Sequence, residues 1–168
     1  MFCFEQKQDA EKFFQALSKR LGKFGLEIAP EKTKIVPFSR MRLSQGNRFD
    51  FLGFEFRWGI SRKSKPQIIR RTSRKKLNAS VANFTEWIKT NRNKKISKIL
   101  TTLKAKYRGY WNYYGVIGNQ GSLNTFYYLT RRILFKWLNR RSQRLSYNWD
   151  GFRELMTQFS IPAPMITE

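Results

Sequence analysis

The chain has 168 residues and a formal charge of +23, because 34 lysines and arginines stand against 11 acidic residues. Solubility asks a small domain for a net charge of only about 2 to 8, so the excess indicates a polyanionic partner. No stretch reaches the roughly 18 apolar residues of a membrane-spanning helix, and no signal-peptide pattern is present. We therefore expect nucleic acid rather than membrane as the partner, and an intracellular, cytoplasmic setting. One cysteine and no histidine exclude an internal disulfide and leave no ordinary zinc or haem ligand set.

The first part of the chain predicts a mixture of helix and short strands. Residues 1–5 are a short apolar run that indicates the end of a buried strand. Asp9 is the predicted N-cap of an amphipathic helix, which Gly25 ends. A strand is predicted over residues 35–38.

Aromatic residues alternate along FDFLGFEFRWGI, residues 49–60, which predicts one extended strand. Gly53 in its middle indicates a bulge, or a backbone that another group approaches closely. Residues 67–71, QIIRR, predict the returning strand. The apolar period then changes from two to 3.6 at Ser73, so a domain boundary is expected over residues 71–73.

Three amphipathic helices are predicted after this boundary, within residues 73–158. Apolar residues three and four apart mark the first over residues 77–88, the second over residues 100–114 and the third over residues 123–138. Residues 159–168 contain two prolines and are predicted to be an irregular tail.

The second helix carries the most informative stretch, KAKYRGYWNYYGVIGN, residues 104–119. It combines an aromatic stripe with flanking cations, and it is predicted to end near Gly115 on a left-handed residue. Glycine inside a helix costs about 1 kcal/mol relative to alanine, so Gly109 beside Arg108 indicates that a partner approaches closely. The same rings at helical spacing can also fill a core, and this alternative stays open.

In this order and spacing, these segments resemble the C-terminal part of a group II intron-encoded reverse transcriptase, also called a maturase. Residues 2–38 resemble the segment that follows the family's catalytic Tyr-Ala-Asp-Asp box, and FDFLGF resembles its primer-grip strand. RRTSRKKL, YRGYWNYYGVIGN and FKWLNRRSQ resemble the maturase-specific domain, also called the thumb or X domain. The resemblance implies an α+β fold. A truncated reverse-transcriptase palm remnant with a primer-grip hairpin, residues 1–71, would precede an all-α three-helix thumb, residues 73–158.

The resemblance implies a protein that binds intron RNA for splicing and the RNA–DNA template–primer duplex for reverse transcription. Two-metal polymerisation needs clustered carboxylates, and no Asp-Asp pair occurs among the 11 acidic residues. The chain is therefore predicted to be inactive alone as an RNA-directed DNA polymerase and to hold no metal or other cofactor; Mg²⁺ is expected only for the complete polymerase. Two alternatives stay open. One is a stand-alone basic RNA-binding protein, and the other is a complementing subunit of a split reverse transcriptase, with the missing N-terminal portion as its partner.

The candidate site residues fall into three groups. The resemblance implies a primer-grip role for Phe51, Leu52 and Gly53, although an ordinary hydrophobic hairpin also explains them, and a phosphate-contacting role for Lys32 and Lys34. The basic candidates for contact with RNA phosphates and 2′-hydroxyls are Arg74, Lys75, Lys76, Lys104, Arg108, Arg132, Lys136, Arg140 and Arg141. The candidates for stacking on unpaired bases, at about 1–3 kcal/mol per base, are Tyr110, Tyr113 and Tyr114.

Overall fold

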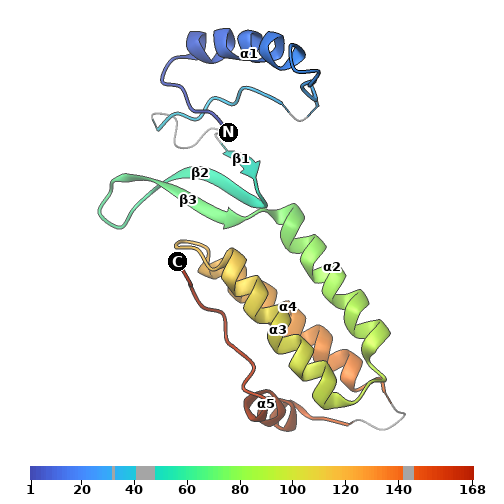
Figure 1. The fold of residues 1–168 in the computed structure, drawn as a ribbon. Coiled ribbons are helices and arrows are strands. Elements are labelled where there is room, and N and C mark those ends of the chain that lie inside the picture. The colour runs from blue at the N-terminus through green and yellow to red at the C-terminus, as the bar shows by residue number, and fades with distance from the viewer. Residues whose placement is uncertain (32, 41–47, 142–145) are drawn as a thin grey trace. The chain divides into compact units, whose positions relative to one another are not determined.

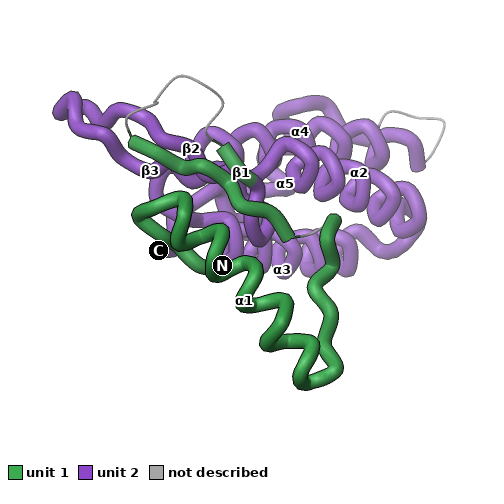
Figure 2. Tube along the Cα trace, turned by 90° about the horizontal axis from the view of Figure 1, so that it is seen from above, with its two compact units in different colours: residues 1–49 green, residues 50–168 purple. Residues whose placement is uncertain are grey.

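The computed structural model of the chain describes residues 1–31, 33–40, 48–141 and 146–168. It divides into two compact units, Met1–Phe49 and Asp50–Glu168 (Figure 2). Lys32, one of the two candidate phosphate contacts of the first unit, lies outside the described residues.

The first unit is built on the helix α1 (Lys7–Gly22). Its N-cap is Gln6, so Asp9 is not the cap that was predicted. Asp9 lies instead in the first turn, where a carboxylate interacts favourably with the positive end of the helix dipole. The helix ends at Gly22, a few residues before the predicted stop, and Gly25 follows with a φ of +68°.

Both strands predicted for the first unit are wrong, since residues 1–4 and 33–39 are neither helix nor strand. The apolar side chains of the first segment serve α1 instead. The rings of Phe2 and Phe4 pack against Phe13 with centroid distances of 4.7 and 5.1 Å. A short apolar run indicates that its side chains are buried against a neighbouring element. It does not show whether that element is a strand or a helix.

Three strands form one sheet in the order β1 (Arg48–Phe51), β2 (Phe54–Ile60) and β3 (Pro66–Thr72). β2 and β3 are antiparallel, and their register runs from Phe54 opposite Thr72 to Ile60 opposite Pro66. The single strand predicted over residues 49–60 is therefore broken. Leu52 and Gly53 form a two-residue turn with φ values of 49° and 83°, the left-handed pair that a tight hairpin requires. Gly53 is a turn residue and not a bulge, whereas the predicted alternative, a close approach to its backbone, is confirmed, since a Cβ built on it would lie 3.0 Å from the Tyr114 hydroxyl oxygen.

The helical part contains the three predicted helices, α2 (Arg74–Asn91), α3 (Ile96–Tyr114) and α4 (Gln120–Leu138), side by side in one bundle (Figure 1). A short additional helix, α5 (Trp149–Gln158), extends the three-helix prediction. The fold class is thus α+β with a helical C-terminal part, as predicted. The core of the bundle consists of side chains that are at most 5% exposed, and it includes Ile88, Leu103, Leu134 and Phe152.

Residues 161–168 have no regular secondary structure, as predicted, but they pack along α3. The indole Nε1 of Trp111 donates to the carbonyl of Pro162 at 3.3 Å, and Thr167 N donates to the carbonyl of Gly115 at 2.7 Å. A Cβ on Gly115 would lie 2.7 Å from Thr167 Oγ1, so the close approach of this segment requires glycine. Gly115 has a φ of −75°, and the predicted left-handed helix end is wrong.

The boundary between domains was predicted over residues 71–73, and the change from strand to helix occurs there, at Thr72 and Ser73. The compact units nevertheless separate between Phe49 and Asp50, inside β1. The strands β2 and β3 therefore belong to the same unit as the helices of the bundle. The independent folding of residues 73–158 stays a prediction, and the contacts of Thr72 and Thr167 with the bundle make residues 50–168 the more complete unit.

Candidate nucleic-acid interface

The turn between β1 and β2, the start of α2 and the end of α3 lie together, so members of three of the predicted groups form one cluster. A Cβ placed on Gly53 would lie 3.5 Å from Lys76 Cγ and 3.0 Å from the Tyr114 hydroxyl oxygen. The hydroxyl of Tyr113 donates to the Leu52 carbonyl at 2.9 Å. We call these five residues the hairpin cluster. Its backbone turn, one cation and two aromatic rings come from three segments that are distant in the sequence.

Buried Asn119, at the turn between α3 and α4, holds the end of β3 against the bundle. Its Oδ1 accepts from Thr72 N at 2.8 Å, and its Nδ2 donates to Thr72 Oγ1 and to the Tyr114 carbonyl, both at 2.8 Å. This role of Asn119 was not predicted from the sequence. A single asparagine after Gly118 gives no sign in the sequence that it will be buried.

The first turn of α2 concentrates positive charge. Ser73 caps the helix by accepting from Lys76 N at 3.4 Å, and Arg74, Lys75 and Lys76 are all exposed. Cations at the positive end of a helix dipole are unfavourable unless an anion lies close to them. α1 and α5 each have an aspartate in the first turn, whereas α2, α3 and α4 have no acidic residue there. The start of α2 therefore suits a bound phosphate.

A second concentration of charge surrounds Trp137 in the last turn of α4. The Arg92, Arg140 and Lys136 charges lie 5.0, 5.6 and 6.0 Å from the centroid of its ring. We call these four residues the Trp137 cluster. Within the described part of the chain, none of the three cations has an acidic partner within 4.0 Å. The ring quadrupole partly offsets the repulsion among the cations, and a phosphate would remove most of it.

Arg92 of the Trp137 cluster was not among the predicted residues, because it stands at the C-cap of α2 and far in sequence from α4. Arg141, which was predicted, is half-buried, and its Nη2 donates to the Lys94 carbonyl at 2.9 Å. This bond ties the end of α4 to the connection between α2 and α3. One of the Arg141 donors is therefore already used within the protein.

The remaining predicted cations differ in how available they are. Lys34, Arg108 and Arg132 are exposed, and a Cβ built on Gly109 beside Arg108 would meet no described atom within 4 Å beyond its chain neighbours and the adjacent backbone of its own helix. Nothing in the fold therefore requires glycine at this position of α3. Lys104 is half-buried, and its Nζ donates to the Phe159 carbonyl at 3.4 Å.

The three predicted tyrosines separate in the structure. Tyr110 stacks on Phe126 with a centroid distance of 3.8 Å and an angle of 9°, and burial raises its pKa to about 12. It belongs to the core, which removes it from the candidates for base stacking. Tyr114 is half-buried against Phe54 at 5.3 Å. Tyr113 is 52% exposed and keeps an accessible ring.

Two further features bear on what the chain can bind. Among the described residues, no three or more His, Cys, Asp or Glu side chains gather as a set that could hold a metal ion. Across the same ranges, no helix combines the length and the apolar character needed to cross a bilayer.

Comparison with known families gives one match. Residues 74–155 match the family model of the group II intron, maturase-specific domain. No curated protein and no solved structure matches the chain. The matched segment begins at the first residue of α2 and ends within α5, so it covers the helical bundle and leaves out the hairpin.

Proposed function

Because residues 74–155 match the family model of the group II intron, maturase-specific domain, we propose that the chain binds structured intron RNA through the cationic ends of its helices. The observation that carries the proposal is the uncompensated charge at the start of α2 and around Trp137. Phosphates would neutralise both places, and the release of counterions from RNA would drive association. The shape of a folded RNA would then be read by contacts to phosphates and 2′-hydroxyls.

We propose a second role for the hairpin cluster, the contact with a template–primer duplex. The exposed Leu52 side chain at the turn, the Lys76 cation beside Gly53 and the accessible Tyr113 ring support it, because they offer apolar, cationic and aromatic contacts at one place. The primer-grip assignment of Phe51, Leu52 and Gly53 belongs to this proposal, and it requires the rest of a polymerase.

The test of RNA binding is the salt dependence of affinity. If six to ten phosphates are neutralised, affinity for a folded intron RNA should fall about 10³- to 10⁵-fold between 50 and 200 mM salt. Replacing Arg74, Lys75 and Lys76 together by Gln should lower the slope of log K against log salt by about 0.7 to 0.9 for each lost phosphate contact.

The matched control removes three exposed cations from the end of α1 in the first unit, Lys19, Arg20 and Lys23. It changes the net charge of the chain by the same amount. The proposal expects a much smaller change of slope in this control. A flat salt response of the unaltered chain, or an equal change in both variants, would contradict it.

We propose no DNA synthesis by this chain alone, because its 11 acidic residues include no Asp-Asp pair to hold two metal ions. Primer extension with Mg²⁺ or Mn²⁺ checks this, and activity of the purified chain would overturn it. Activity that appears when a separate polymerase portion is added would support the complementing-subunit alternative. Salt-sensitive RNA binding without such complementation would support the stand-alone RNA-binding alternative.

A further inference from the structure

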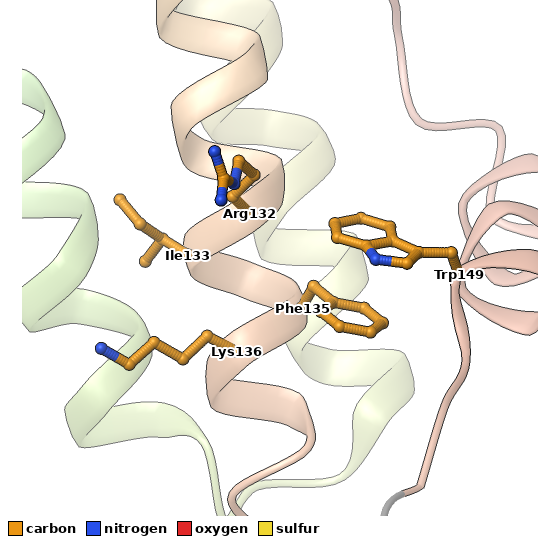
Figure 3. A pocket seen from close by; sticks show the side chains of 5 residues that line it. All are labelled: Arg132, Ile133, Phe135, Lys136 and Trp149. Carbon is orange, nitrogen blue, oxygen red and sulfur yellow. The ribbon is translucent and has the colours of Figure 1, made fainter.

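A pocket of about 370 Å³ lies beside the C-terminal half of α4, lined by Arg132, Ile133, Phe135, Lys136 and Trp149. Figure 3 shows Phe135 and Trp149 on the side of α4 toward α5, and Ile133 and Lys136 on the other side, with Arg132 between them. The aromatic pair therefore borders the pocket on one side and Lys136 on the other, with Arg132 between them. The volume of the pocket lies at the small end of ligand sites, which suits one flat molecule rather than a helix.

Trp149 provides a fixed aromatic wall. Its ring lies parallel to Phe135, with centroids 4.0 Å apart and an angle of 9°, and its edge meets the ring of fully buried Phe152. The residue Trp149 is nevertheless 46% exposed. One face of a large flat ring is thus held against the protein, and much of the rest is left for a partner.

Two asparagines fix the backbone that carries this ring. Asn139 Oδ1 accepts from Ser146 N at 3.0 Å and from Tyr147 N at 2.8 Å, and its Nδ2 donates to the Tyr147 carbonyl at 2.9 Å. Asn148 then caps α5 by accepting from Gly151 N at 2.8 Å. Trp149 directly follows this cap, so its position is set before any ligand arrives.

The two cations of the pocket, Arg132 and Lys136, can each bind an anion. Arg132 is exposed, and its Nη1 donates to the Tyr128 hydroxyl at 3.0 Å, which leaves further N–H donors of the guanidinium available. Lys136 is exposed and has no acidic partner within 4.0 Å in the described part of the chain. The adjacent carboxylate, Asp150, is already paired with Arg153.

We propose that this pocket binds one unpaired nucleotide of RNA, with its base stacked on the open face of Trp149 and its phosphate held by Arg132 and Lys136. The inference rests on the proposed function and adds a preference for single-stranded or bulged positions. A base inside a duplex already stacks on its neighbours and cannot present a face to an indole, whereas an unpaired base can. Two cations beside one stacking platform fit a nucleotide better than an acidic peptide, which has no planar ring to stack.

The experiment compares a single-stranded oligoadenylate with a blunt duplex RNA, using the whole chain. Trp149→Ala should weaken binding of the oligoadenylate about 5- to 150-fold, the range for one stacked base, and should change duplex binding less than about twofold. Trp149→Phe should keep most of the affinity, because a ring remains. The control is Phe24→Ala, which removes an exposed ring from the first unit and should change neither affinity.

Fluorescence supplies a readout that does not depend on folding of the alanine variant. A stacked base quenches indole emission, so oligoadenylate should quench the unaltered chain and quench Trp149→Phe much less at saturation. Arg132→Gln should lower the salt slope for oligoadenylate by about 0.7, the loss of one phosphate contact on a single strand.

The outcomes separate the two proposals. If the unaltered chain binds no oligoadenylate, the nucleotide pocket is wrong, and the salt titration with a folded intron RNA decides the proposed function separately. If the chain binds both the oligoadenylate and the duplex, and the Trp149 variants change neither the affinity for oligoadenylate nor the quenching, the nucleotide pocket is wrong and the proposed function stands.

Discussion

The two compact units contain amphipathic helices of similar pattern but bury them to different degrees. α1 in the first unit contains no fully buried residue, and its apolar face, with Phe13 and Leu17, is half-buried. α3 in the second unit fully buries five residues, from Ile99 to Trp111. Periodicity predicts which side of a helix is apolar, but the energy comes from the surfaces that cover it. The second unit has such surfaces, and α1 is covered only in part.

The largest expected effect tests this difference with one substitution made in both helices. Leu103→Ala should lower the free energy of unfolding by about 2–5 kcal/mol, because Leu103 is completely buried in the bundle. Leu17→Ala should lower it by about 1 kcal/mol or less, since Leu17 is half-buried. Urea unfolding followed by tryptophan emission measures the first, because all five tryptophans lie in the second unit.

Circular dichroism and hydrogen exchange measure the effect of Leu17→Ala on α1. If the two substitutions lowered stability equally and in the same transition, the two units would unfold together. The contrast between a covered and a half-covered apolar face would then be wrong.

An intermediate effect is expected at the contact between Asn119 of the bundle and Thr72 at the end of β3. Asn119→Ala removes three hydrogen bonds and leaves the Thr72 N–H and the Tyr114 carbonyl without this partner in a buried place. The free energy of unfolding should fall by about 1–3 kcal/mol or more. The amide of Thr72 should also exchange faster with solvent. The control is Gln120→Ala at the neighbouring exposed position, where little change is expected.

These positions also show how much of the structure could be predicted from the sequence. α2, α3 and α4 could be predicted because each carries a long apolar stripe, whereas α5 was missed. Phe152 and Met156 do stand four apart after the cap residue Asn148, so a signal existed, but ten residues give a weak period. Exposed cations at the helix ends were predicted from composition and spacing. Of the three cations around Trp137, Lys136 and Arg140 were predicted, and Arg92 was not, because it reaches the ring from the end of another helix.

Gly53 and Gly115 show the same limit at the level of the backbone. Both were recognised as unusual positions. Gly53 has the predicted close approach but not the bulge, and Gly115 does not have the predicted left-handed conformation. Gly53 adopts a left-handed turn, and Gly115 lets the segment around Thr167 approach α3. A glycine marks a constraint on the chain, but the sequence does not say whether a dihedral angle or a neighbouring atom imposes it.

The smallest expected effect concerns the ion pair that joins Glu168, in the C-terminal segment 161–168, to Arg70 in β3. Glu168 Oε2 accepts from Arg70 Nη2 and, at 3.1 Å, from the Ile117 amide, and these hydrogen bonds lower the pKa of its carboxyl. A lowered folded-state pKa means that the contribution to stability is present above the usual pKa of the carboxyl and is lost as the pH falls through the folded value. Both partners are more than a third exposed, so the contribution is small.

Glu168→Gln should therefore lower the urea midpoint of the second unit slightly at pH 7, and the difference should disappear as the pH falls well below the usual value of 4.5. The matched control is Glu11→Gln in α1, which removes an exposed ion pair with Lys7 and should leave the tryptophan-detected midpoint unchanged. A difference between the unaltered chain and the Glu168→Gln variant that persists at low pH would mean that the charge of this carboxylate is not what fastens the segment. Shape and the backbone bonds of Thr167 to Gly115 would then hold residues 161–168 in place by themselves.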